Sequence, residues 1–306
     1  MAHESPLACN TVLAATEPIT IKNCQPPPRW GFSVPENANK RMPTALITGA
    51  SSGIGEALAH CFAEAGHHLV LVARNRAKLR TLADELARRH GIVAGVQVAD
   101  LSQTGAATRL AATLRRKRWA VDVLVNNAGV LAQGSFVDLT PESQQQIIDL
   151  NIRGLTAMLS AFLPDMVRRA ARGSVGRVLN VASIAAFQPV PTLATYAASK
   201  AYVLSLTESL AEELKDSGVT VTALCPGITA THMLSAAKDA NDKVGHIPGF
   251  LVGDVNEVAR QGFKACMKGE VICVPGAINR AAMIASRGTP RWLVRRLGGM
   301  LGRKAL

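Results

Sequence analysis

The sequence predicts an α/β protein built on one doubly wound parallel β-sheet of about seven strands, flanked by helices. Short apolar runs alternate with helix-compatible stretches from Thr44 onward. Strands that are separated by helices pair in parallel through right-handed crossovers. Aromatic residues make up only 4% of the chain, and a core of small aliphatic residues suits strands packed closely beneath helices.

The strand candidates are apolar runs of four to six residues, bounded by polar or turn-forming residues. They are Ala45 to Thr48, Leu69 to Ala73, Val93 to Val98, Val121 to Val125, Val178 to Ala182, Val219 to Leu224 and Val271 to Val274. Helical periodicity falls between them, most clearly in Glu56 to Glu64, Arg76 to Arg89 and Pro141 to Met166. We expect residues 43–276 to form a single domain that includes a substrate lid at about 230–254.

Residues 1–42 are predicted to form a disordered N-terminal tail. Three consecutive prolines begin at Pro26, and the stretch 31–39 has no sustained strand or helix periodicity. A natural start of the chain at Met42 is the second interpretation, and a targeting role is the third.

The net charge of +12 favours anionic partners, and half of it lies in six basic residues from Arg287 onward, with no acid among them. These residues belong to a predicted basic amphipathic extension, 277–306. On a helix, one face of its last part would be apolar, formed by Trp292, Leu293, Leu297, Met300 and Leu301. Packing on its own domain or on a subunit partner is favoured over peripheral membrane contact through 287–306, and both stay open.

Other classes of protein are disfavoured by composition. No apolar run approaches the roughly 20 residues that cross a bilayer, so we expect a cytoplasmic protein, with or without contact to the membrane surface. The six cysteines form no Cys-x-x-Cys pair and are interpreted as reduced thiols. The histidines are scattered and do not have the spacing of metal ligands, so no metal site is expected. Few aromatic residues accompany the basic ones, so nucleic acid is not an expected partner.

A glycine-rich turn follows the first predicted strand. It reads Thr-Gly-Ala-Ser-Ser-Gly-Ile-Gly from Thr48 to Gly55 and leads directly into a helix. Gly49 permits a tight turn and Gly53 lets a ligand approach the backbone, while the first helical amides can bind a pyrophosphate. The turn is therefore predicted to hold the phosphates of a dinucleotide.

The second predicted strand ends in Ala73-Arg74-Asn75, where an NAD-specific fold usually places an acid to bind the adenosine ribose. Arg74 offers instead a planar group of donors suited to a 2′-phosphate. The sequence therefore favours NADP(H) over NAD(H), with a solvated loop arginine as the alternative.

Tyr196 and Lys200 are four residues apart and so share one face of a helix. A free tyrosine titrates near a pKa of ~10, and a neighbouring cation lowers that pKa by stabilising the phenolate. Tyr196 also lies thirteen residues after Ser183 (196 − 183), which closes the fifth predicted strand. Tyr196 and Lys200 are therefore candidates for proton transfer, and the role of Ser183 depends on the family resemblance given next.

Taken together, these motifs resemble the short-chain dehydrogenase/reductase family. Asp100-Leu101, Asn126-Asn127-Ala128-Gly129 and the segment Cys225 to Thr231 resemble further family motifs, each after a predicted strand. The resemblance covers about residues 44–231 and implies a Rossmann-type fold. It implies a cofactor site made of Gly49, Ser51, Ser52, Gly53, Ile54, Gly55, Arg74, Asp100, Leu101, Asn127, Ala128, Gly129, Tyr196, Lys200, Pro226, Gly227, Thr229 and Thr231.

The resemblance also implies catalytic roles for four residues. Ser183 would bind the substrate carbonyl and Tyr196 would donate its proton. Lys200 would bind the nicotinamide ribose and lower the tyrosine pKa, and Asn151 would orient a water that relays protons to Lys200. A local backbone contact is the alternative role for Asn151.

The predicted function is NADP(H)-dependent hydride transfer to or from a carbonyl or secondary alcohol of a hydrophobic substrate: a ketone, aldehyde, acyl or steroid-like molecule. Substrate contacts are expected from Ala185 to Leu193, including Phe187 and Val190, and from Met233 to Leu251. Family resemblance implies a homodimer or homotetramer. The alternative function is an NADPH-binding regulatory or membrane-surface interaction protein on the same fold.

Overall fold

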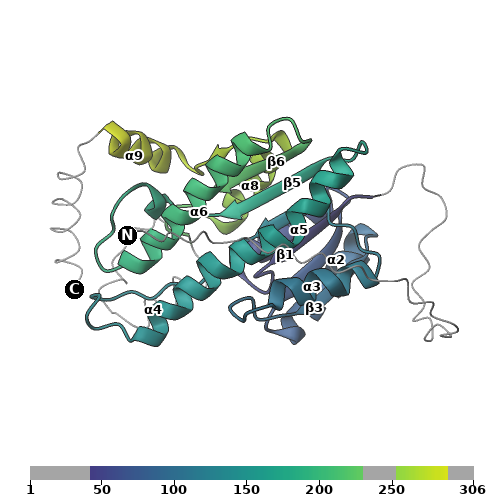
Figure 1. The fold of residues 1–306 in the computed structure, drawn as a ribbon, viewed down its shortest axis with the longest axis horizontal. Coiled ribbons are helices and arrows are strands. Elements are labelled where there is room, and N and C mark those ends of the chain that lie inside the picture. The colour runs from purple at the N-terminus through teal and green to yellow at the C-terminus, as the bar shows by residue number, and fades with distance from the viewer. Residues whose placement is uncertain (1–41, 230–252, 289–306) are drawn as a thin grey trace, which may run out of the picture. The chain divides into compact units, whose positions relative to one another are not determined.

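Seven parallel strands form one sheet in the computed structural model, which describes residues 42–229 and 253–288. Their order across the sheet is β3-β2-β1-β4-β5-β6-β7, as Figure 1 shows in part. The strands are β1 (Thr44–Thr48), β2 (His68–Ala73), β3 (Ala94–Val98), β4 (Val123–Asn126), β5 (Gly176–Val181), β6 (Val219–Leu224) and β7 (Ile272–Cys273). This arrangement confirms the predicted doubly wound α/β fold.

The strand order reverses between β1 and β4, because β2 and β3 lie on one side of β1 and β4 to β7 lie on the other. The loops that leave the carboxyl ends of β1 and β4 therefore diverge and open a crevice. Open parallel sheets bind their ligands at such a reversal. The fold thus sets the place of a site before any side chain is considered.

Two layers of helices cover the sheet, and both interfaces are apolar. On one face, the core cluster contains residues of three helices: α1 (Gly53–Glu64), α2 (Arg76–His90) and α8 (Val255–Lys268). On the other, it contains residues of α3 (Ala106–Arg116), α5 (Leu155–Ala170) and α6 (Ala194–Glu213). Adjacent residues of β1 point to opposite layers, as Leu46 and Ile47 show.

The predicted long helix from Pro141 is interrupted. It consists of α4 (Pro141–Ile147), a π-helical segment, η1 (Ile148–Gly154), and α5. Residues 141–170 together are long and apolar enough to cross a membrane, and no other helix among the described residues is. The apolar residues of α5 are nevertheless buried in the domain core: Leu155, Met158, Leu159, Phe162 and Met166. The helix is therefore accounted for as a core helix.

Two further helices lie at the carboxyl end of the sheet. The short 3-10 helix η2 (Ile184–Phe187) follows β5, and α9 (Ala277–Gly288) follows β7 and packs against η2. Helix α9 begins where the predicted C-terminal extension begins. The rest of that extension, most of the predicted lid and the N-terminal tail lie outside the described residues.

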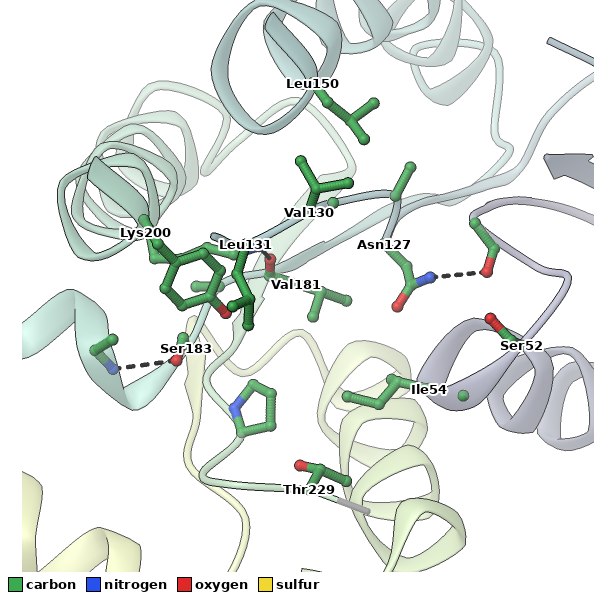
Figure 2. A pocket seen from close by; sticks show the side chains of 18 of the residues that line it. Ser52, Ile54, Asn127, Val130, Leu131, Leu150, Val181, Ser183, Lys200 and Thr229 are labelled. Atoms are coloured by element: carbon green, nitrogen blue, oxygen red, sulfur yellow. Dashed lines mark hydrogen bonds between the residues drawn. The ribbon is translucent and has the colours of Figure 1, made fainter. Parts of the chain in front are cut away.

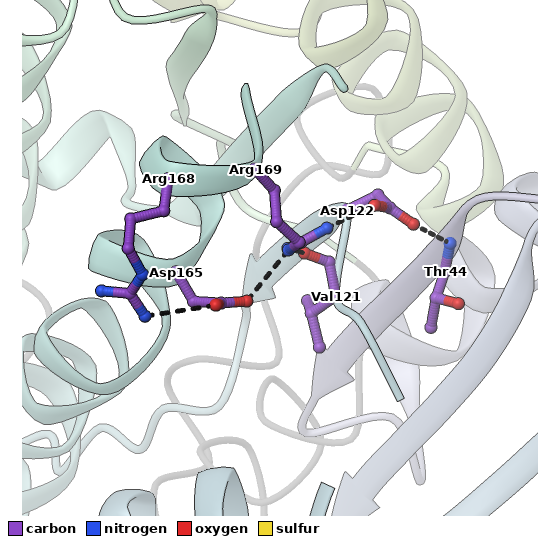
Figure 3. Close-up of polar contacts among 6 residues, drawn as sticks. All are labelled: Thr44, Val121, Asp122, Asp165, Arg168 and Arg169. Atoms are coloured by element: carbon purple, nitrogen blue, oxygen red, sulfur yellow. Dashed lines mark hydrogen bonds and ion pairs between the residues drawn. The ribbon is translucent and has the colours of Figure 1, made fainter. Parts of the chain in front are cut away.

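A polar cluster closes the opposite edge of the sheet, at the amino ends of the strands (Figure 3). Asp122 accepts hydrogen bonds from the Thr44 backbone N–H at 2.8 Å and from Arg169 at 2.7 Å. Arg169 also donates to the carbonyl of Val121 and to Asp165. The cluster connects the end of α5 to the starts of β1 and β4. It therefore lies at the end of the strands opposite the crevice.

Candidate active site

A cavity of about 700 Å³ lies at the carboxyl ends of the strands and is lined by loops after β1, β2, β3, β4, β5 and β6. Figure 2 shows Ser183 and Lys200 on one side of it and Ser52 and Ile54 on the other. Most predicted site residues line this cavity: Gly49, Ser51, Ser52, Gly53, Ile54, Arg74, Asp100, Leu101, Asn127, Ala128, Gly129, Ser183, Tyr196, Lys200, Pro226, Gly227 and Thr229. Gly55 and Asn151 do not line it, and Thr231 lies outside the described residues.

The turn after β1 has the form of an anion cradle. Ser52 is the N-cap of α1 but its side chain makes no capping hydrogen bond, so its hydroxyl and the first helical amides are free to bind a ligand. Gly49 and Gly53 have φ values of 64° and 61°, which favour glycine. A Cβ at Gly49 would also lie 2.7 Å from the Asn127 amide nitrogen. The residues present therefore fit a dinucleotide phosphate.

Gly55 has a packing role in this turn. A methyl group there would overlap the Gly49 carbonyl and the Asn127 amide. Asn127 donates from its amide to the carbonyls of Thr48 at 2.9 Å and Gly49 at 3.2 Å. Gly55 thus lets α1 approach the turn closely, and the side chain of Asn127 fixes that turn.

Thr48, the first residue of the predicted turn, has a positioning role that the sequence analysis did not state. Its hydroxyl accepts hydrogen bonds from the backbone N–H groups of Asn127 at 2.9 Å and Ala128 at 3.0 Å, and donates to Val125 O at 3.2 Å. It therefore connects the two diverging loops at the crevice. A hydroxyl at the last position of β1, directly before the glycine turn, was the available signal.

Arg74 is exposed at the cavity wall and forms no hydrogen bond or ion pair with the described residues. Its guanidinium is therefore free to bind an anionic ligand. Asp100, nearby, accepts hydrogen bonds from the backbone N–H of Ser102 at 3.0 Å and from its hydroxyl at 2.6 Å. The Ser102 hydroxyl is the main cause that lowers the Asp100 pKa, and the charge of Arg74 adds to it.

Ser183, Tyr196 and Lys200 come together where β5 ends beside the start of α6. Ser183 caps η2 by accepting a hydrogen bond from the Ala185 N–H at 3.1 Å. Lys200 is buried and donates to Val181 O at 2.8 Å. Its Nζ lies 5.7 Å from the centre of the Tyr196 ring. The geometry thus places a hydroxyl, a phenol and an amine at one end of the cavity.

The pKa directions at this end differ from the expectation that Lys200 lowers the tyrosine pKa. Burial raises the pKa of Tyr196, and the hydrogen bond with Ser183 only partly opposes it. Burial also lowers the pKa of Lys200 to about 8, against an opposing effect of Cys225. The cost of removing both groups from water outweighs their electrostatic support, an effect that sequence spacing does not contain.

Asn151 lies in the π-helical segment and is buried. Its Oδ1 accepts from the Val130 N–H at 2.9 Å, and its Nδ2 donates to Val130 O at 2.9 Å and to the Ser199 hydroxyl at 3.1 Å. Ser199 in turn donates to Tyr196 O at 2.7 Å. Asn151 therefore connects the loop after β4 to the helix that carries Tyr196, and its role in a proton relay stays a prediction.

Part of the predicted substrate region lines the cavity. Phe187 does not line it, because this partly buried side chain packs against the core cluster. Met233 to Leu251 lies outside the described residues. The predicted stretch after Ser183 supplies Ala185, Gln188, Val190 and Leu193. Lining residues that the sequence interpretation missed include Val130, Leu131, Gln133, Leu150, Ile184 and Ile228.

A Rossmann-type sheet with a phosphate cradle and a Ser-Tyr-Lys group on one cavity defines a dinucleotide-binding oxidoreductase. The family model described as short chain dehydrogenase matches residues 43–242. The chain therefore belongs to the short-chain dehydrogenase/reductase family, whose members act on CH–OH and C=O groups.

Individual relatives agree with this assignment. Oxidoreductase UcpA of Salmonella typhimurium is 38% identical over 200 residues, which cover 65% of this chain and 74% of that protein. The short-chain dehydrogenase from Sphingobium yanoikuyae in complex with NADPH is 34% identical with a TM-score of 0.71, covering 80% of this chain and 93% of that one. The bulky-bulky ketone specific alcohol dehydrogenase from Comamonas testosteroni is 32% identical with a TM-score of 0.66, covering 80% and 92%.

Proposed function

We propose that this protein is an NADPH-dependent reductase of hydrophobic ketones or aldehydes. The observation that carries the proposal is the convergence of Ser183, Tyr196 and Lys200 on the cavity whose other end holds the phosphate cradle and Arg74. A bound nicotinamide would supply a hydride to the carbonyl carbon. The protein must then bind the carbonyl oxygen and deliver one proton to it.

Each of the three residues has a role in that step. The Ser183 hydroxyl binds the carbonyl oxygen and stabilises the charge that develops there. Tyr196 donates the proton from its phenol to the same oxygen. Lys200 holds the ribose of the nicotinamide nucleotide and favours the phenolate that remains. Asn151 keeps the loop after β4 in register with α6, through its bonds to Val130 and Ser199.

The proposed direction rests on the proposed cofactor. A nicotinamide cofactor in its reduced form donates hydride, so a protein that binds NADPH through Arg74 would run the reaction as carbonyl reduction. Tyr196 in its phenol form then supplies the proton, and the same group as phenolate would serve the reverse reaction. We therefore propose reduction as the main direction.

The preference for NADPH rests on Arg74. Its free guanidinium lies at the end of β2, where the 2′-phosphate of the adenosine ribose would lie in this fold. A charge-assisted bidentate contact there favours the phosphorylated cofactor. The related Sphingobium enzyme was solved with NADPH, which agrees with this proposal.

The substrate end of the cavity favours an apolar molecule. Leu131, Val190 and Leu193 form its walls, and Gln133 and Gln188 add two amides that could orient a substrate oxygen. The Comamonas relative is named for bulky ketones. We also propose that the protein is cytoplasmic and forms a homodimer or homotetramer through the helices α5 and α6, as the family resemblance implies.

The test is a panel of carbonyl compounds assayed with both NADPH and NADH. The panel should contain small polar aldehydes, aryl ketones, long-chain ketones and ketosteroids. We expect turnover with hydrophobic ketones and a preference for NADPH. Cofactor binding without turnover of any carbonyl compound would favour a cofactor-sensing role instead, and an NADH preference would remove the role of Arg74.

A further inference from the structure

One side of α9 is apolar and exposed. Ala277, Ile278, Ala281 and Ile284 are all exposed, and the two isoleucines have exposed fractions of 57% and 66%. Ala277, Ala281 and Ile284 follow spacings of four and three residues, and Ile278 lies three residues before Ala281. At 3.6 residues per turn the four side chains fall within an arc of about 120° on one side of the helix. Two isoleucine side chains left in water on a single helix lose a stabilisation that burial would supply. We call Ala277, Ile278, Ala281 and Ile284 the α9 face.

The opposite side of α9 fixes this orientation. The Asn279 amide donates to Pro275 O at 2.8 Å and lies against Gly227, where a Cβ would be 2.6 Å from it. Met283, one turn later, packs against the core cluster. Asn279 and Met283 therefore hold this side of the helix against the domain. The α9 face points outward, and Arg280 is exposed at its edge.

A second exposed apolar group lies in the loop between β4 and α4. Phe136 and Val137 have exposed fractions of 61% and 85%. They lie in the loop after β4 that also supplies Leu131 and Gln133 to the cavity wall. Figure 1 shows α9 and the loop leading to α4 at one end of the domain, beyond the carboxyl ends of the strands. Apolar side chains are thus exposed on α9 and on a loop whose earlier residues line the cavity, at the same end of the domain.

The charge of the chain identifies the partner. The segment that begins within α9 at Arg287 and continues to residue 306 contains six basic residues and no acid. An apolar helix face followed by a basic segment is the combination that binds anionic lipid surfaces. Self-association through the α9 face would bring two such basic segments near each other, which like-charge repulsion disfavours.

From these observations we infer that the α9 face, together with Phe136 and Val137, docks on an anionic phospholipid bilayer, with the cavity opening towards the lipid. The inference goes beyond the proposed reductase activity and does not depend on it. A bilayer contact at this place would give an apolar molecule dissolved in lipid a direct route to the cavity.

Vesicle co-sedimentation of the full chain tests the inference. Vesicles of equal parts phosphatidylcholine and phosphatidylglycerol are compared with pure phosphatidylcholine vesicles. The test variant is Ile278→Ser/Ile284→Ser, and the matched control is Val175→Ser, which removes an apolar side chain of 53% exposure at the amino edge of β5. A charge variant, Arg291→Gln/Arg295→Gln/Arg296→Gln, tests the basic segment. Circular dichroism of every variant reports folding.

The wild type and Val175→Ser should bind the anionic vesicles and bind pure phosphatidylcholine far less. The isoleucine variant should bind at least about tenfold more weakly, because each isoleucine that leaves lipid loses on the order of tenfold in affinity. The charge variant should lose most of the dependence on phosphatidylglycerol and on salt. Equal binding of wild type and isoleucine variant would overturn the inference. So would a change of oligomeric mass, measured by sedimentation velocity, without a change in vesicle binding, because the face would then be a subunit interface.

Discussion

The amine of Lys200 lies 5.7 Å from the centre of the Tyr196 ring, and its hydrogen bond to Val181 O anchors it to the end of β5. The lysine is therefore positioned by the sheet and not by the phenol hydroxyl. Loss of that hydroxyl should leave the amine, and with it the cofactor side of the cavity, in place. This separation of chemistry from binding makes Tyr196 the sharpest test of the proposed mechanism.

Tyr196→Phe should reduce turnover by about 10²-fold or more, the scale of losing a positioned proton donor. The dissociation constant for NADPH, measured by fluorescence titration, should change little. Tyr202→Phe is the matched control, because Tyr202 is exposed and its hydroxyl contacts Thr156 outside the cavity. Unchanged turnover in Tyr196→Phe would remove Tyr196 from the reaction.

Burial of Lys200 should make the stability of the protein depend on pH. Its pKa falls from an ordinary value of 10.5 to about 8 on folding. Between these pH values the unfolded chain holds a proton that the folded chain has lost, so the destabilisation caused by burying this amine is full at neutral pH and disappears as pH rises from about 8 to 10.5. The full effect corresponds to about 3 kcal/mol.

Urea unfolding of wild type and Lys200→Met at a series of pH values measures this effect. The free energy of unfolding of the variant should be higher than that of the wild type, and this difference should be largest at neutral pH. That difference should shrink by about 3 kcal/mol towards pH 10.5. Lys215→Met, which removes an exposed amine, is the control. A difference that stays constant with pH would show that the buried amine keeps its ordinary pKa.

The fold and the cavity could be predicted from the sequence because parallel strands bring their carboxyl ends to one edge. Gly49, Arg74 and Ser183 each follow a strand, so their positions along the chain already place them together. The residues that were misjudged depend on contacts between segments distant in sequence. Thr48 hydrogen-bonds across to the loop after β4, and Phe187 turns into the core.

The pKa of Tyr196 shows a second limit of sequence reasoning. A spacing of four residues places Lys200 near Tyr196, but it does not say how much water either group loses. Burial is a property of the assembled domain, and here it dominates both pKa values. Asn151 is similar, because only the π-helical geometry and the loop after β4 show that its amide is occupied by Val130 and Ser199.

Arg74→Glu should raise the dissociation constant for NADPH by roughly 10- to 100-fold, which is the worth of a charge-assisted hydrogen bond. Binding of NADH should change much less, because it carries no 2′-phosphate. Arg80→Glu removes an exposed arginine of α2 that does not line the cavity and is the charge-matched control. Equal losses for both cofactors would indicate that Arg74 does not read the 2′-phosphate.

Gly55→Ala should destabilise the protein although Gly55 does not line the cavity. The added methyl would overlap the Gly49 carbonyl and the Asn127 amide, and such overpacking costs about 1–3 kcal/mol. NADPH affinity should fall as well, because the turn that holds the phosphates must shift. At Gly173 no atom lies within 4 Å of an added Cβ, so Gly173→Ala bears only the cost of its positive φ, about 1 kcal/mol. Equal NADPH affinities in the two variants would contradict the packing role.

Asp122 should matter for stability and not for chemistry. Its carboxylate is nearly buried and accepts hydrogen bonds from the Thr44 N–H and Arg169. Asp122→Ala therefore leaves a strand amide without its acceptor and leaves Arg169 with only its bonds to the more exposed Asp165 and to the Val121 carbonyl. Breaking such a pair costs about 3 kcal/mol.

Asp165→Ala is the control variant and removes the other carboxylate on Arg169. Asp165 is 44% exposed, and loss of an exposed ion pair costs below about 1 kcal/mol. Because Asp122 lies at the amino edge of the sheet, opposite the cavity, turnover per folded molecule should be the same in both variants. A similar free energy of unfolding for the two variants, measured in urea, would mean that burial does not set the strength of this cluster.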